Sequence, residues 1–287
     1  MFSIVLGVRF DMNIYGLVVI YNSYLDKDVF ERFLSFGITP LIYDNSNKEE
    51  YYLKNREIAN SEHLHYDGNG TNLGLPKAYN SIITKYLTSE DDWLLIFDQD
   101  TPLPDEYFKI VLDKIHHGDK LCYMPFFPLH RKEHYAPNTI SNVKTMHVKK
   151  TTSFHHMEGH LIGINSCSAF SSKVFKIAGL FNEKLYLDYV DNDLFARMAY
   201  HNIISETLDI KLVQNFFAGE KHPYKAIKRR LANIKYDAKT FYSNDFIRKS
   251  SRLRLYLRDV WKYSLKYSIV NNPFYLLPLV LTRPKHI

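Results

Sequence analysis

Cysteine is scarce in this chain. Its 287 residues contain only Cys122 and Cys167, which lie far apart and match no metal-binding spacing. A disulfide framework is therefore not expected, and a reducing cytoplasm fits the composition. We predict that both side chains lie in the hydrophobic core.

Long hydrophobic runs are also missing. A helix that crosses a membrane needs roughly 18 to 20 apolar residues, and the best candidate, residues 269–281, is interrupted by two asparagines and two prolines. The first residues lack a charged leader and a small-residue cleavage site, so no signal peptide is expected, and Met12 offers an alternative start to Met1. The sequence predicts a soluble or peripheral protein.

Acidic residues are few at one end of the chain. Of the 37 Lys and Arg and the 31 Asp and Glu, residues 221–287 hold 16 and 3, which leaves 21 and 28 for residues 1–220. Such a basic end suggests contact with an anionic surface, either a membrane or a nucleic acid. It contains no recognised DNA- or RNA-binding module, so we do not expect nucleic acid as a partner.

The first hundred residues alternate two kinds of pattern. Apolar β-type runs occupy residues 15–22, 39–46, 63–67 and 93–100, and helical patterns occupy residues 26–36, 48–59 and 75–87. This rhythm predicts an α/β fold built from right-handed βαβ units, with a mostly parallel sheet and helices on both faces.

Polar residues gather where these predicted strands end. They are Tyr21 and Asn22, then residues 44–46, then residues 67–72, then Asp98 and Asp100. Each group alone is ordinary turn chemistry. Because ligands bind at the carboxyl ends of the strands in such sheets, the four groups together predict a binding site at this edge.

Asp98 and Asp100 are two residues apart at the end of the run "WLLIFDQD", so they point to the same side and repel each other. One interpretation is a solvated loop in which either residue caps the helix suggested after Pro102. The other is a site for Mg²⁺ or Mn²⁺, which prefer carboxylate oxygens and bridge to phosphates. The residue types alone leave both open.

Residues 121–160 read as an irregular insertion that follows the strand-like run "LCYMPFF". The insertion is rich in histidine, but the spacings match no standard zinc pattern. We expect these to be loop residues. They are His130, His134, His147, His155, His156 and His160.

An acidic cluster follows between residues 164 and 202. A helical pattern ends at Gly179, the expected C-cap, and a second amphipathic pattern runs from Asp191 to Tyr200. Asp191 is either the N-cap of this helix or a functional carboxylate, and Asp193 fits a favourable charge in the first turn.

Five segments together resemble the inverting family 2 glycosyltransferases, within the rhamnosyltransferase-like branch that builds bacterial surface polysaccharides. They occur in the order of that family and cover about residues 13–215. The segments are "VVIYN" (18–22), "YDNS" (43–46), "NLGLPKAYN" (72–80), "LLIFDQD" (94–100) and "GLFNEKLYLDYVDNDLFAR" (179–197).

The resemblance implies a Rossmann-like GT-A fold in residues 1–220, with a nucleotide-sugar donor half at about 13–120 and an acceptor half at about 121–220. It implies that Asp44 contacts the base and that glycine in the Asn-x-Gly segment lets the backbone approach ribose and diphosphate. The donor-binding residues implied are Tyr21, Asn22, Asp44, Asn72, Gly74, Lys77, Asn80, Asp98 and Gln99.

The same resemblance implies the chemistry. Asp191 matches the catalytic base, Asp98 and Asp100 match the ligands of Mg²⁺ or Mn²⁺, and inversion follows from in-line attack. The acceptor-side residues implied are Asp188, Asp193 and Ser166.

The chain departs from the family at one position. Many relatives carry a further histidine after the acceptor helix, where this sequence has Gln214 and Asn215, with His222 further on as a weak candidate ligand.

Residues 221–287 are predicted to form a basic helical tail. Arg254, Arg258, Lys262 and Lys266 recur every four residues, and an apolar side is formed by Leu253, Leu257, Val260 and Trp261. With residues 225–235 and 272–284 they predict an element that lies on an anionic membrane at the inner face of the cell membrane. The alternative is a helix packed on the body with a solvated charged face.

The favoured function is transfer of rhamnose from dTDP-rhamnose to a lipid-linked or oligosaccharide acceptor in O-antigen or capsule synthesis. The alternatives are transfer of galactose, galactofuranose or an N-acetylhexosamine from UDP, and a non-catalytic sugar-nucleotide-binding partner. The sequence leaves a homo-oligomeric state open.

Overall fold

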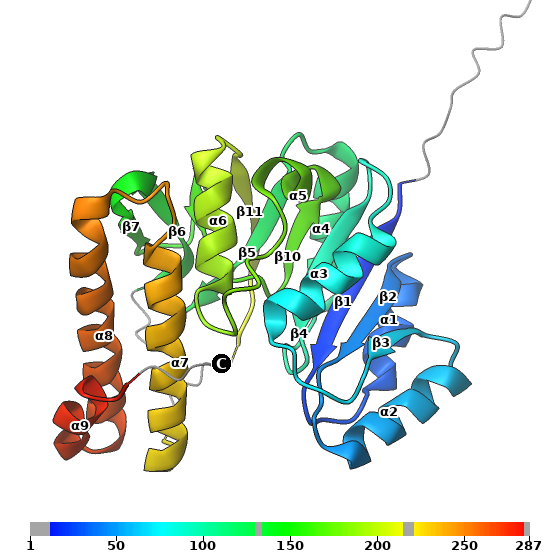
Figure 1. Ribbon diagram of the computed structural model, residues 1–287. Helices are drawn as coiled ribbons and strands as arrows, with labels where there is room; N and C mark the ends of the chain where they lie inside the picture. The colour runs from blue at the N-terminus through cyan, green and yellow to red at the C-terminus, as the bar shows by residue number, and fades with distance from the viewer. Residues whose placement is uncertain (1–11, 130–133, 215–220, 284–287) are drawn as a thin grey trace, which may run out of the picture.

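The computed structural model describes residues 12–129, 134–214 and 221–283 (Figure 1). Its strands are β1 (Ile14–Ile20), β2 (Thr39–Asp44), β3 (His65–Gly68), β4 (Trp93–Asp98), β5 (Cys122–Pro128), β6 (Tyr135–Asn142), β7 (His147–Thr151), β8 (Glu158–Gly159), β9 (Leu161–Ile162), β10 (Ser168–Ser171) and β11 (Ser205–Lys211). Its α-helices are α1 (Lys27–Ser35), α2 (Glu49–Ser61), α3 (Leu75–Tyr86), α4 (Asp105–His117), α5 (Ser172–Ala178), α6 (Val190–Tyr200), α7 (Tyr224–Tyr242), α8 (Lys249–Asn271) and α9 (Leu276–Val280).

The sheet is mixed and mostly parallel in its first half, which confirms the predicted α/β class. Its strands lie in the order β3-β2-β1-β4-β10-β5-β11-β8. The first four are parallel, β10 is antiparallel to both of its neighbours, and β11 is parallel to β5. The alternation of strands and helices along the sequence thus predicted the parallel half correctly.

Alternating side chains of the central strands divide the core into two clusters. Leu94 and Ile96 of β4 face one side with α3, α5, α6, α7 and α8, whereas Leu95 and Phe97 face the other with α1 and α4. This is the period of two that a strand covered on both faces requires. Cys122 and Cys167 are buried and free, as predicted.

The carboxyl ends of the first four strands lie at one edge of the sheet. Ile20 pairs with Asp44 across β1 and β2, Asp44 with Gly68 across β2 and β3, and Val19 with Asp98 across β1 and β4. This register brings the polar residues that follow each strand side by side.

Residues 134–162 differ from the irregular insertion predicted from the sequence. Strand β6 pairs antiparallel with β5, β7 and β9. The apolar residues of this segment are too widely spaced to give a period-two pattern, which explains why it did not read as strands.

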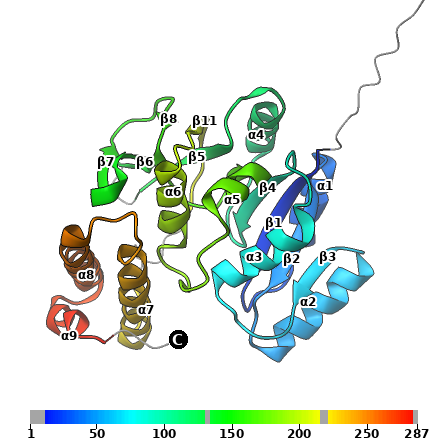
Figure 2. The same cartoon turned by 45° about the horizontal axis from the view of Figure 1, so that its top comes forward.

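The basic C-terminal part forms helices that pack on the body. Figures 1 and 2 both place α7 between α8 and α6. Ile227, Leu231 and Phe241 of α7 and Leu255 of α8 belong to the same buried cluster as α3 and α6. Among the described residues no helix is both long and apolar enough to cross a membrane. The division of the chain at residue 220 stays a prediction.

Candidate active site

A polar pocket with a volume of about 830 Å³ lies at the carboxyl edge of the sheet. Its walls come from the loops after β1, β2 and β4, from the start of α3, from the loop before α6 and from α7. The residues that line it are Val19, Tyr21, Asn45, Asn47, Asn72, Gly74, Leu75, Asp98, Gln99, Asp100, Tyr186, Leu187, Ala226, Arg229, Arg230 and Asn233.

The loops after β1, β2 and β4 are tied together by side chains. The backbone N–H of Tyr21 donates to Oε1 of Gln99 at 2.8 Å, and that of Asn22 donates to Oγ of Ser46 at 2.8 Å. Asn22 Nδ2 donates to Oδ1 of Asn47 at 3.0 Å. Tyr21 and Gln99 therefore lie in the pocket, whereas Asn22 shapes its rim.

Asp44 lies beneath this surface and is fully buried. Its carboxylate accepts hydrogen bonds from the backbone of Ser46 at 2.8 Å, from Nδ2 of Asn55 at 2.8 Å and from the hydroxyl of Tyr66 at 2.9 Å. The neighbouring Asn45 lines the pocket instead and accepts from the backbone of Leu73. A contact between Asp44 and a base stays a prediction.

Gly74 is required where α3 meets the loop before α6. Its φ of 84° lies in the left-handed region, and an added Cβ would come within 3.0 Å of the Tyr186 backbone oxygen. Asn72 accepts from the backbone of Gly74 at 2.9 Å, and Leu75 donates to Tyr186 O at 3.0 Å. The predicted Asn-x-Gly segment therefore holds the pocket open at this corner.

Two residues of α3 lie outside the pocket lining. Lys77 is exposed on the first turn. Asn80 is buried, donates to Phe181 O and to Oε1 of Glu183, both at 2.9 Å, and accepts from the backbone of Phe181 at 2.9 Å. Asn80 thus holds the segment that leads to α6, and a donor contact of either residue stays a prediction.

Asp98 and Asp100 line the pocket together, so the interpretation as helix caps is wrong. The N-cap of α4 is Pro104. A residue that precedes a proline avoids the helical conformation, so α4 begins only after Pro102 and Pro104. Burial, with the nearby charge of Asp100, raises the pKa of Asp98 to about 6. Gln214 Nε2 donates to the Asp98 carboxylate, and the Asp98 backbone donates to Oγ of Ser166 at 3.2 Å.

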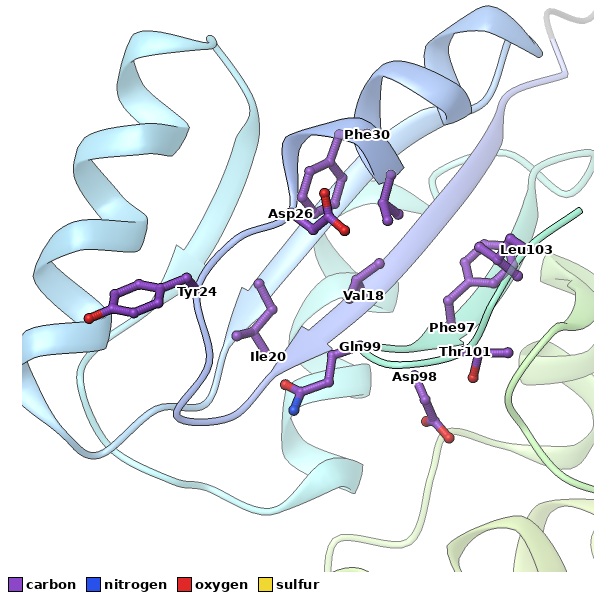
Figure 3. Close-up of a pocket in the computed structure, with 11 residues that line it drawn as sticks. Val18, Ile20, Tyr24, Asp26, Phe30, Phe97, Asp98, Gln99, Thr101 and Leu103 are labelled. Atoms are coloured by element: carbon purple, nitrogen blue, oxygen red, sulfur yellow. The ribbon is translucent and has the colours of Figure 1, made fainter. Parts of the chain in front are cut away.

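A second cavity of about 30 Å³ lies on the α1 side of the same strand ends. Figure 3 shows that it is enclosed by apolar side chains such as Val18, Phe30 and Phe97, while the side chains of Asp98 and Gln99 point away from them. This cavity is too small for a nucleotide.

Asp191 lies in the first turn of α6 and is not its N-cap. The N-cap is Tyr189, in the left-handed region at φ 60°, so the helix begins one residue earlier than the sequence indicates. Burial and the charge of Asp98 raise the pKa of Asp191 to about 7, and a hydrogen bond with the backbone of Asn165 opposes the shift. Burial, followed by the charges of Asp98 and Asp191, raises the pKa of Tyr79 well above its ordinary value.

The other two acidic residues of the cluster are engaged within the protein. Asp188 pairs with Arg230 of α7 at 2.8 Å. Asp193 is buried, pairs with Nε of Arg197 at 2.8 Å and accepts from Nδ2 of Asn244 at 2.8 Å. Ser166, also buried, contacts the backbone of Asp98 and the hydroxyl of Thr101. An acceptor contact of Asp188, Asp193 or Ser166 stays a prediction.

No group of three His, Cys, Asp or Glu side chains within the described residues is arranged to hold a metal ion. His222 stands just before α7, where its backbone donates to Oδ1 of Asn271 at 2.9 Å, and it is not part of the pocket lining. His130 and Asn215 lie outside the described residues. Oxygen atoms of the kind that hard cations prefer do lie here: Asp98 and Asp100 offer two carboxylates, and the buried Oε1 of Gln214 has no hydrogen-bond partner within the described part of the chain.

The sequence did not predict that residues of α7 line the pocket. Ala226, Arg229, Arg230 and Asn233 recur at the spacing of one helix face, but they sit in a basic segment that resembles a membrane-facing surface. Which face of a basic helix is covered depends on its packing, so no local signal could have assigned these residues to the pocket.

Comparisons with known proteins identify relatives of this chain and structures with a similar fold. No family model matches the chain. Over 213 residues it is 30% identical to the dTDP-rhamnosyl transferase RfbF of Shigella flexneri, a match that covers 70% of this chain and 68% of the relative.

Among solved structures, the mannosyltransferase PcManGT from Pyrobaculum calidifontis, in complex with GDP-Man and Mn²⁺, is similar with a TM-score of 0.52 and 13% identity, covering 93% of this chain and 72% of that one. The S. aureus TarS fragment 1–349 in complex with UDP-GlcNAc is similar with a TM-score of 0.51 and 12% identity, covering 91% and 74%. Because the sequence identities are this low, the two structures support only the assignment of the fold.

Proposed function

Because the chain belongs to the glycosyltransferases of the GT-A fold and is related to a dTDP-rhamnosyl transferase, we propose that it transfers rhamnose from dTDP-rhamnose to a lipid-linked or oligosaccharide acceptor in bacterial surface polysaccharide synthesis. The observation that carries the proposal is that Asp98 and Asp100 line a pocket together with amide side chains, and that the charge of Asp98 acts on Asp191 in the first turn of α6. Amide side chains can form hydrogen bonds with a nucleotide, and Gly74 allows the backbone to approach such a ligand closely.

Asp191 is the proposed base. An acceptor hydroxyl is a weak nucleophile until its proton is removed during attack, and a carboxylate whose pKa is raised to about 7 accepts that proton better than an ordinary aspartate. A base on the side opposite the leaving group leads to inversion at the anomeric carbon, by the displacement logic of inverting hydrolases.

Asp98, Asp100 and Gln214 are the residues that would hold a divalent cation. The pKa of Asp98, raised by burial and by Asp100, indicates an excess of negative charge that a cation relieves. Mg²⁺ or Mn²⁺ bound there supplies Lewis-acid stabilisation of the diphosphate that leaves. The orphaned Oε1 of Gln214 is the oxygen ligand that this chain offers near the place where many relatives have histidine.

The surface of α8 supports a membrane as the place of reaction. Leu253, Leu257, Trp261 and Leu265 are between 45% and 68% exposed, although they are large and apolar. They alternate with the basic stripe of Arg254, Arg258, Lys262 and Lys266. We propose that this face lies on anionic lipid, where a lipid-linked acceptor would be presented.

The test is release of nucleoside diphosphate from a panel of donors led by dTDP-rhamnose and UDP-galactose, with and without Mn²⁺, in the presence of a lipid-linked or synthetic glycan acceptor. Selective, acceptor-dependent release from dTDP-rhamnose supports the proposal. Selective release from a UDP-sugar replaces the donor, and nucleotide binding without release from any donor supports the non-catalytic alternative.

A further inference from the structure

Helix α7 forms one wall of the donor pocket. Ala226, Arg229, Arg230 and Asn233 line the pocket at intervals of three and four residues, so one face of the helix is turned toward it. Figure 1 shows the N-terminal half of α7 at the end of the molecule where β1 and β4 finish. The basic segment at 225–235 therefore contributes positive charge to the pocket, and not only to the outer surface.

The two arginines of this wall differ in their partners. Arg230 pairs with Asp188, a residue of the loop before α6, at 2.8 Å, so its charge is balanced inside the protein. Within the described residues Arg229 forms no ion pair or hydrogen bond, and its side chain is exposed to the pocket. Burial raises the pKa of Tyr186, which packs close to Gly74 at the corner of the same pocket, and the charge of Arg229 opposes this shift.

The charges around the pocket define what Arg229 can bind. Asp98 and Asp100 line the pocket and would repel an anion unless a cation were bound between them and the ligand. A divalent cation held by these two carboxylates would offset their charge, and the diphosphate of a sugar nucleotide would still need positive charge from the protein. Among the described residues that line the pocket, Arg229 can supply this positive charge, because Arg230 is already paired with Asp188. The planar guanidinium group of arginine also suits two phosphate oxygens at once.

We propose that Arg229 binds the diphosphate of the nucleotide-sugar donor and stabilises it as the leaving group. This inference rests on the proposed function. In the reaction the bond between the anomeric carbon and the diphosphate oxygen breaks, and its electron pair goes to that oxygen. The acceptor oxygen forms the new bond, and its proton goes to Asp191. Because the leaving group gains negative charge, the contact with Arg229 strengthens as the bond breaks.

The decisive measurement is calorimetric binding of dTDP, UDP and thymidine to the full-length protein with Mn²⁺, for the wild type, Arg229→Gln, Arg229→Lys and Lys239→Gln. Lys239 is exposed on the same helix, outside the pocket lining, and serves as the matched control. We expect Arg229→Gln to bind the nucleoside diphosphate roughly 10- to 100-fold more weakly, because charge-assisted hydrogen bonds are lost. Arg229→Lys should recover part of this loss, and thymidine binding should not change.

The outcomes distinguish the diphosphate of the donor from the phosphate of a lipid-linked acceptor. They also distinguish failure of the role of Arg229 from failure of the proposed function. If the wild type binds a diphosphate and Arg229→Gln binds it equally well, the inference is wrong. If diphosphate binding is unchanged while KM for a phosphate-linked lipid acceptor rises, Arg229 serves the acceptor and the assignment to the donor is overturned. If the wild type binds no nucleoside diphosphate at all, the proposed function itself fails.

Discussion

The negative charge of Asp98 raises the pKa of Asp191, although 92 residues separate them in the sequence. Asp98 ends β4, and Asp191 lies in the first turn of α6. The end of a parallel strand and the beginning of a helix thus bring Asp98 close enough to the proposed base for its charge to act on it. This relationship gives the site its pH dependence.

The pH profile of kcat/KM should rise through an apparent pKa near 7. Asp191 acts as a base only when it is ionised, and burial with the charge of Asp98 raises its pKa to about 7. Activity should therefore increase roughly tenfold from pH 6 to pH 8. A cation beside Asp98 offsets the negative charge there, so an enzyme saturated with Mn²⁺ should show this limb at lower pH. A profile that falls over this range would contradict the role of Asp191.

Asp191→Asn should retain donor binding and lose transfer. The amide keeps the shape of the side chain but cannot accept the proton, so turnover should fall by about 10² to 10⁴. Binding of dTDP by calorimetry is the control, because the pocket walls are unchanged. Near-normal turnover by this variant would exclude Asp191 as the base.

Binding of Mn²⁺ should stabilise the folded protein more at pH 7.5 than at pH 5.5. The pKa of Asp98 is raised to about 6, so at the lower pH protons compete with the cation for this carboxylate. At a metal concentration one hundred times the Kd, the expected gain is about 2.7 kcal/mol, read as an increase in Tm. Asp100→Asn should remove most of this increase, and an unchanged increase in that variant would place the cation elsewhere.

Asp237→Ala should destabilise the protein and lower kcat together. The Asp237 carboxylate on α7 accepts backbone hydrogen bonds from Tyr186 at 3.0 Å, Leu187 at 3.0 Å and Asp188 at 2.8 Å, in the loop that leads to α6. Losing these bonds to a buried charged group should cost roughly 2 to 4 kcal/mol, measured by urea unfolding. Asp237→Asn keeps one acceptor and should lie between the wild type and the alanine variant. Wild-type stability in Asp237→Ala would show that the loop holds its shape without α7.

The double variant Arg254→Glu with Lys262→Glu should lose binding to vesicles that contain anionic lipid. Both residues lie on the exposed face of α8, where each basic group near an anionic surface contributes about 1 kcal/mol. Co-sedimentation at increasing salt measures the effect. Lys54→Glu on α2 with Lys109→Glu on α4 reverses the same number of exposed charges on helices other than α8 and should bind as the wild type does. Equal loss in both double variants, or comparable binding to duplex DNA, would argue against a membrane face on α8.

The sequence predicted the local parts of this protein well. The runs that became β1 to β4 and the helical patterns that became α1 to α3 carry their own periodicity, and Gly179 ends α5 as expected, at φ 80°. Asp98 and Asp100 were recognised as candidates because residues two apart at a strand end share one side. These features depend on neighbours in the chain, which a sequence displays directly.

Some helix boundaries and side-chain partners could not be predicted from residues adjacent in the sequence. Whether Asp98 or Pro104 would cap the next helix, and whether Asp191 would begin α6 or follow a left-handed Tyr189, depended on backbone conformations that packing selects. The composition of residues 225–235 showed that this segment is basic. It did not show which arginine would pair with a carboxylate and which would face the pocket.

The sequence by itself determined the fold class, the edge of the sheet where the polar residues gather and the basic character of the C-terminal helices, because these follow from periodicity, turn chemistry and composition. Only the tertiary structure decided that the charge of Asp98 acts on Asp191, that Asp44 and Asp193 are engaged inside the protein, and that α7 turns Arg229 toward the pocket. The physical reason is that charge interactions and burial depend on distance in space, which the packing of helices on the sheet sets.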